Sequence, residues 1–217
     1  MLFIHSFQSE WLKTKRSLAS WLVIIGGCFT PLIIIVIRLV KPLSLKPLTM
    51  LPNYWKTHWQ SSWESMAIML LPLGVILASS LITQLEFKNN TWKQVHTTPQ
   101  YFTTIFFAKL AVIVVMMLQF FFFFNIGIYL SGIIPPLLLN DVEFPKGDIP
   151  YLFFLKQNAF YFLDCLPIIG LQYLISLLFK NFLVPVGAGL LIWIGSIAAL
   201  TWNFAYLVPY TYSSLYF

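Results

Sequence analysis

Long apolar runs dominate this sequence and leave few choices for its fold. A helix needs about 20 mostly apolar residues to cross the hydrocarbon core of a bilayer. Runs of at least that length lie at about 18–40, 65–85, 104–134, 151–179 and 182–201. The sequence therefore predicts an all-α integral membrane protein with five clear transmembrane helices, built as a single domain over residues 1–217.

The composition excludes a soluble domain and a nucleic-acid-binding protein. Only 9% of the residues are charged and 59% are hydrophobic, whereas soluble domains carry about 25% charged residues. The net charge of +6 is spread along the chain without a basic run, and it fits contact with anionic lipid headgroups. Cys28 and Cys165 both lie in apolar runs, so we interpret them as small core residues and not as a disulfide or metal site.

The first residues, 2–17, have an amphipathic pattern that predicts an interfacial helix on the membrane surface. Its anchoring residues would be one aromatic and three basic side chains: Trp11, Lys13, Lys15 and Arg16. The alternative is a plain start of the first span. The same basic cluster, directly before that span, favours a cytoplasmic N-terminus. No cleavable signal peptide is evident, because the following run is too long for one.

Three further features bear on the outer segments and the helix ends. Trp55, Trp59 and Trp63 are spaced four apart, so they share one helix face and predict an interfacial anchor within 51–64. Pro135 and Pro136 are expected to end the third span. The tail from residue 202 is aromatic but too polar for a confident span, so it is an interfacial helix or the approach to a span that is missing.

Polar residues inside the apolar runs are the candidates for an intramembrane site. Asp164 lies well inside the fourth run. Because a carboxylate is energetically costly inside a bilayer, its presence there suggests a functional role. It would bind a cationic substrate, relay a proton or pair with Lys156, two turns away; the structural alternative is a hydrogen-bonded carboxyl that joins helices. Gln119 and Asn125 are further candidates for this polar site, although they and Gln172 are expected mainly to bond between helices.

A polar segment at 84–99 separates the second and third runs and predicts a short helix outside the bilayer. It mixes a carboxylate, lysines, amides and the large aromatic Trp92. That mixture favours a docking site for a soluble partner over a solvated connector. The chain has no G-x-x-x-x-G-K-[ST] sequence, and its histidines and cysteines lack metal-ligand or catalytic spacing, so we expect neither an enzyme nor a metal site.

At these residues the chain resembles the ABC type-2 transporter permeases, and most of all the short permeases associated with lantibiotic immunity and multidrug export. Four features in order carry the resemblance along essentially the whole chain. They are Ser9–Ser17 before the first run, Glu86–Lys93 with Thr97-Thr-Pro99, Lys109 at the start of the third run, and Phe179–Asn181 with Tyr206–Tyr210 at the end.

The resemblance implies a six-helix half-transporter that pairs with a second permease copy or paralogue and with a separate ATP-binding cassette ATPase. ATP and Mg would bind that partner, and this chain would hold no cofactor of its own. The loop at 86–99 would be the coupling helix that contacts the ATPase, through Glu86, Lys88, Asn89, Asn90, Thr91, Trp92 and Lys93. The sixth span expected from the family is not evident before Phe217.

We therefore expect a permease subunit in a bacterial plasma membrane, which couples ATP hydrolysis elsewhere to the export of a hydrophobic or amphipathic substrate such as an antimicrobial peptide. Two alternatives stay open. One is an ATP-independent carrier that uses Asp164. The other is a membrane anchor or regulatory subunit that transports nothing.

Overall fold

The computed structural model describes residues 2–15, 17–41, 49, 51–88, 101–139, 142–145 and 147–215, and the side chains of Leu2, Glu86, Phe87 and Lys88 are outside this description. The described part is helical, without strands. Its elements are α1 (Leu2–Thr14), α2 (Leu18–Val40), α4 (Tyr54–Ser65), the π-helix η1 (Met66–Leu70), α5 (Leu71–Lys88), α7 (Phe102–Leu138), α8 (Tyr151–Leu178), α9 (Leu183–Ala199) and the 3₁₀ turns η2 (Ala205–Leu207) and η3 (Pro209–Ser214).

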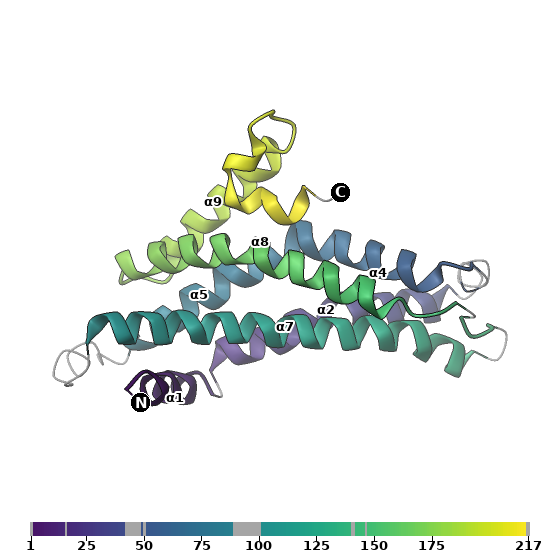
Figure 1. The fold of residues 1–217 in the computed structure, drawn as a ribbon, viewed down its shortest axis with the longest axis horizontal. Helices are drawn as coiled ribbons and strands as arrows, with labels where there is room; N and C mark the ends of the chain where they lie inside the picture. Colours follow the sequence, from purple (N-terminus) through teal and green to yellow (C-terminus); the bar gives the residue numbers. More distant parts are fainter. Residues whose placement is uncertain are drawn as a thin grey trace.

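Within the described ranges, four helices are long and apolar enough to cross a membrane: Leu18–Val40, Tyr54–Leu85, Phe102–Leu138 and Tyr151–Leu178. They run lengthwise through the bundle, with α9 diverging from α8 (Figure 1). The fifth predicted span, α9, has 17 residues, at the lower limit for crossing a bilayer. Four to five apolar helices therefore fit a multi-pass membrane protein.

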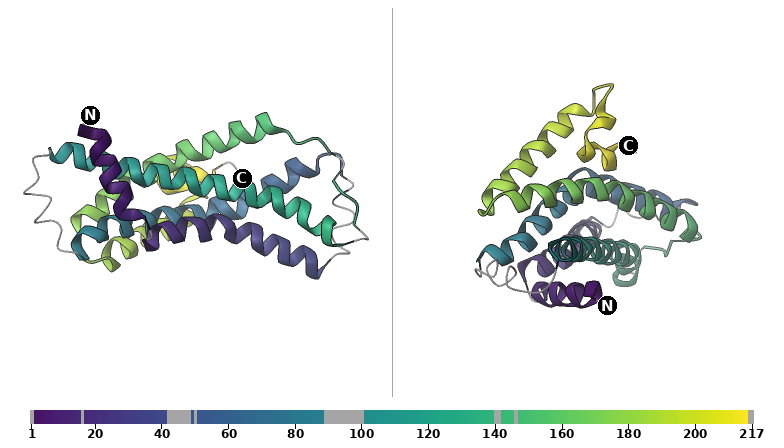
Figure 2. Two further views of the ribbon diagram at one scale, coloured as in Figure 1. Left: turned by 90° about the horizontal axis from the view of Figure 1, so that it is seen from below. Right: turned by 60° about the vertical axis from the view of Figure 1, so that its left-hand side comes forward.

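The amphipathic N-terminal segment forms α1, which lies across the end of the bundle where α7 begins (Figure 2). Its carboxylate Glu10 is buried and accepts from Lys13 one turn later. The same carboxylate lies 3.6 Å from the ammonium of Lys109 on α7, which is 3% exposed. This ion pair joins the transverse helix to the first turns of α7.

The second span is longer than predicted, and its tryptophans do not face lipid. It starts at Tyr54 and runs through α4, η1 and α5 without a break. Trp63 is fully buried and stacks on Tyr161 of α8 with ring centroids 4.4 Å apart, while Trp59 stacks on Phe154 at 5.3 Å. The prediction of an interfacial anchor was wrong, because the shared helix face packs against α7 and α8.

Pro72 explains the π-helical turn within the second span. The N–H of Leu71 bonds the Met66 carbonyl five residues back, and Pro72 has no N–H to give. The carbonyls of Ala67 and Ile68 therefore lose their usual helical donors. Side chains from distant segments replace them: Ser213 Oγ donates to Ala67 at 3.0 Å and Trp193 Nε1 donates to Ile68 at 3.1 Å.

The consecutive prolines Pro135 and Pro136 in α7 leave another carbonyl that needs a donor from a distant segment. The third span was expected to stop at Pro135-Pro136, but α7 continues to Leu138, since the Leu139 N–H still reaches the Pro135 carbonyl. Pro135 leaves the Ser131 carbonyl without a helical donor, and Arg38 Nη1 of α2 donates to it at 2.9 Å. Proline near a helix end is tolerated here because a neighbouring helix supplies the missing donor.

Arg38 also fixes the surrounding polar side chains. Its guanidinium donates to the Tyr54 hydroxyl at 2.7 Å and to His58 Nδ1 at 2.9 Å. Because arginine has donors only, His58 Nδ1 is the acceptor, and its Nε2–H donates to Ser131 Oγ at 2.9 Å. This cluster ties α2, α4 and α7 together at the end of the bundle where α4 begins.

The segment after α9 turns back onto the bundle. Tyr210 is buried, burial raises the pKa of its phenol, and its hydroxyl donates to Gln172 Oε1 at 2.8 Å. Gln172, fully buried on α8, also donates to the Pro185 carbonyl of α9 at 2.9 Å, which confirms the expectation that it bonds between helices. The tail is thus a set of packed 3₁₀ turns, neither a span nor a helix lying free at the surface.

Candidate functional site

A cavity of about 820 Å³ lies between α7 and α8, with tryptophans of α4 at its base, and we call it the α7–α8 cavity. Its volume is within the range of small-molecule sites. Among the described residues, no Asp, Glu, Lys or Arg lines it. Most of its wall is aromatic or aliphatic and includes Trp55, Trp59, Phe121, Phe122, Tyr129, Phe154 and Phe162.

The rim of the α7–α8 cavity faces outward from the bundle. Phe122 is 62% exposed and Leu155 is 70% exposed, and both line the cavity. The base is the opposite: Trp59 is 2% exposed and packs between Phe153 and Phe154. The cavity is therefore open at the outer face of the bundle and closed towards its core.

A small polar group interrupts this apolar wall. Asn125 of α7 and Asn158 of α8 bond each other reciprocally, at 2.9 and 3.0 Å. Asn125 also accepts from Trp59 Nε1 at 3.2 Å. Each amide donates its second hydrogen to the carbonyl four residues back in its own helix, Phe121 for Asn125 and Phe154 for Asn158. The pair therefore holds α7, α8 and α4 together at the wall of the cavity.

The hydrogen bonds already made by the two amides limit what they can offer to a ligand. A side-chain amide has two donor hydrogens and an oxygen with two lone pairs. All four donor hydrogens of Asn125 and Asn158 are used, and the oxygen of Asn125 accepts twice. One lone pair of Asn158 Oδ1 is left. The amide pair can thus accept one hydrogen bond from a ligand and donate none.

The other residues predicted for the polar site do not gather at this cavity. Gln119 is exposed on α7 and Asp164 is half-buried on α8, and neither lines it. The Lys156 ammonium lies over the ring of Phe160, at 5.8 Å, and not against Asp164. Of the three predicted residues, the structure places only Asn125 at the cavity; a substrate role for any of them stays a prediction.

The predicted coupling residues fall at the edge of the described structure. Glu86 and Lys88 belong to the last turn of α5, and Asn89, Asn90, Thr91, Trp92 and Lys93 lie outside the described residues. The predicted membrane-surface residues lie on or just after α1: Trp11 stacks on Phe7, Lys13 pairs with Glu10, and Lys15 is exposed. Arg16 lies outside the described residues.

Sequence reasoning missed Asn158 and the role of Trp59. Asn158 is a polar residue within the fourth apolar run, and that position alone could have marked it as a candidate for the polar site. Its partner Asn125 is 33 residues away, and pairing across helices cannot be deduced from one sequence. Trp59 was noticed for its spacing. Its indole N–H, which reaches Asn125, is what distinguishes it from a lipid-facing anchor.

The comparison with known proteins gives a family for most of the chain. Residues 6–196 match the protein-family model described as ABC-2 family transporter protein. No curated protein and no solved structure matches the chain. The matched range begins within α1 and ends within α9, so it includes all four helices that are long enough to cross a membrane.

Proposed function

This chain belongs to the ABC-2 transporter family, and from that membership we propose that it is the permease subunit of an ATP-binding cassette exporter of the bacterial plasma membrane. Its cargo is hydrophobic or amphipathic, such as a membrane-associated antimicrobial peptide. A separate ATPase subunit hydrolyses ATP with Mg, and a second permease copy or paralogue completes the transporter. The N-terminus and the loop at 86–99 lie on the cytoplasmic side.

The observation that supports this cargo class is the α7–α8 cavity. Its wall is apolar and aromatic, and the Asn125–Asn158 pair leaves one acceptor lone pair open. A charged group placed there would lose its hydration without finding a counter-charge, at a cost of several kcal/mol. A neutral apolar segment with one N–H or O–H donor satisfies the cavity, so we expect that part of the cargo to bind there.

The connectivity of the helices supports a coupling role for the loop at 86–99. The loop that we assign to the ATPase joins the end of α5 to the start of α7, and α7 forms one wall of the cavity. A displacement of this loop by the ATPase would therefore move α7 relative to α8. The cargo is transported only if the two arrangements bind it differently.

The first experiment is affinity purification of the tagged chain from its own host in a mild detergent. A soluble partner with a P-loop, recovered in stoichiometric amount, supports the proposal. Recovery of the chain alone, under conditions that keep other membrane complexes intact, would point to the carrier that depends on Asp164.

The second experiment tests coupling in proteoliposomes that contain the complex. Trp92→Ala and Glu86→Arg should leave the spans folded but separate ATP hydrolysis from cargo movement. Asp164→Asn is the comparison, because the carrier alternative requires that this variant abolishes transport while changes in the loop are silent. Normal transport and normal ATPase binding in both loop variants would refute the coupling role.

A further inference from the structure

A second cavity, of about 360 Å³, is also lined by Trp59 and has a different chemistry. We call it the Glu64 pocket. Trp59 and Tyr161, both nearly fully buried, form its base. The side chains around them are mostly polar and come from α4 and α8: Thr57, Gln60, Ser61, Glu64 and Gln157.

The carboxylate and the two amides among these side chains have no partner among the described residues. Glu64, Gln60 and Gln157 take part in no hydrogen bond or ion pair with them. Gln60 and Glu64 are four residues apart on α4 and so share one helix face, while Gln157 approaches from α8. The pocket therefore gathers one carboxylate and two amides whose hydrogen-bonding capacity the described residues do not use.

Glu64 is the only charged residue that lines the pocket, as far as the structure describes it. A cation of α4 itself already lies over one of the rings that line the pocket. The ammonium of Lys56 lies 5.0 Å from the ring centre of Phe153, which lines the pocket too. A cation over an aromatic face is stabilised by the ring quadrupole, and a carboxylate beside it adds to the attraction.

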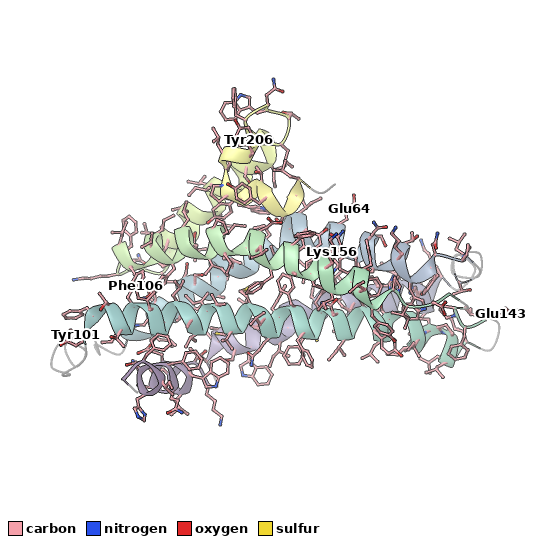
Figure 3. All side chains as sticks on the ribbon, in the orientation of Figure 1. Glu64, Tyr101, Phe106, Glu143, Lys156 and Tyr206 are labelled. Atoms are coloured by element: carbon pink, nitrogen blue, oxygen red, sulfur yellow. The ribbon has the colours of Figure 1, made fainter. Side chains whose placement is uncertain are left out.

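The depth of Glu64 is compatible with a charged ligand. The helical stretch from Glu64 to Lys88 is about 36 Å long at about 1.5 Å per residue, and the hydrocarbon core is about 30 Å thick. If Lys88 is at one membrane surface, Glu64 is at the headgroup level of the other. Figure 3 shows Glu64 on the side of the bundle away from α7, and its side chain is exposed.

We propose that the Glu64 pocket binds a primary ammonium group. Glu64 supplies the negative charge, and the amide oxygens of Gln60 and Gln157 accept the remaining N–H donors of a group that has three. The same ammonium chemistry is found in an amphipathic amine and in the headgroup of an ethanolamine lipid. The site is separate from the α7–α8 cavity, although Trp59 lines both.

The test is a binding titration of the full chain in nanodiscs of phosphatidylglycerol, with dodecylammonium as the probe and dodecanol as its neutral counterpart. Glu64→Gln keeps the size of the side chain and removes only the charge, and we expect it to weaken dodecylammonium binding about fivefold to tenfold. Dodecanol should bind wild type and variant equally. Equal dodecylammonium affinity in both proteins would overturn the proposal.

Two further variants control for net charge and for folding. Asp148→Asn removes a carboxylate from the loop before α8, away from the pocket lining, and should leave the affinity unchanged. Lys56→Met removes the cation that competes for Phe153 and should tighten binding severalfold. A loss of affinity in Asp148→Asn as large as that in Glu64→Gln would show a general effect of surface charge and would also overturn the proposal.

Replacing half of the phosphatidylglycerol by phosphatidylethanolamine identifies the natural source of the ammonium. Weaker dodecylammonium binding to wild type but not to Glu64→Gln indicates that the lipid headgroup occupies the pocket. Unchanged binding to wild type indicates a free amphipathic amine. The assay needs neither ATP nor transport, so its failure would leave the permease proposal untouched.

Discussion

Pro72 and Trp193 should be energetically coupled, although they lie on different helices. Trp193→Phe keeps an aromatic ring but removes the N–H that donates to the Ile68 carbonyl. In wild type this change leaves that carbonyl without the donor that Pro72 cannot supply. An unsatisfied polar group of this kind costs about 1–3 kcal/mol, and lost ring area adds to that.

The Pro72→Ala background changes the outcome, because residue 72 then has an N–H that can serve Ile68 in an α-helical register. Trp193→Phe should then cost only its packing contribution. The interaction energy of the double-mutant cycle is expected to be about 1 kcal/mol or more, above the error of about 0.3–0.5 kcal/mol for independent sites. The free energies come from denaturant unfolding in mixed micelles.

Trp202→Phe is the matched control, since Trp202 is 55% exposed and its indole nitrogen has no partner among the described residues. Its cycle with Pro72→Ala should be additive. If Trp193→Phe costs the same free energy in both backgrounds, the indole is not replacing the missing backbone donor, and the explanation of the π-helical turn is wrong.

Two more predictions concern stability. A Cβ at Gly132 would lie 2.7 Å from two ring atoms of the buried Trp55, so Gly132→Ala should cost about 1–3 kcal/mol. At Gly195 the added Cβ would have no atom within 4 Å, so Gly195→Ala should be neutral or stabilising by up to about 1 kcal/mol. Thermal unfolding of both variants checks this, and equal shifts in melting temperature would contradict it. Ser213→Ala should cost about 1–3 kcal/mol, because its hydroxyl donates to the Ala67 carbonyl of the π-helical turn. Ser214→Ala, at a half-buried position, should cost less than about 0.5 kcal/mol. Similar melting temperatures for the two serine variants would count against the role of the Ser213 hydroxyl.

Much of the fold could be predicted from the sequence because bilayer thickness fixes the length of an apolar run. The first span, 18–40, coincides with α2, and the fourth differs from α8 by one residue. The family was also predictable, since short motifs in a fixed order survive where overall similarity is low, and residues 6–196 confirm it.

The errors arose where a residue has two plausible environments. A row of tryptophans suits both a membrane interface and a packed helix face, and only the partners on α7 and α8 decide between them. Pro135 ends a helix in isolation, but Arg38 supplies the donor that lets α7 continue. The α7–α8 cavity could not be predicted, because it depends on how Asn125 meets Asn158, and that contact has no local signal.

The turn at Pro72 also imposes an order on the synthesis of the protein. The donors for its carbonyls come from residues 125 and 146 positions later in the chain. At about 5–20 residues per second, a ribosome needs roughly 6–30 s to reach them. Until then the carbonyls of Ala67 and Ile68 lack the side-chain donors that they have in the folded chain. Water or another part of the membrane has to bond these carbonyls in the meantime, so the second span reaches its final hydrogen bonding only after η3 has been made.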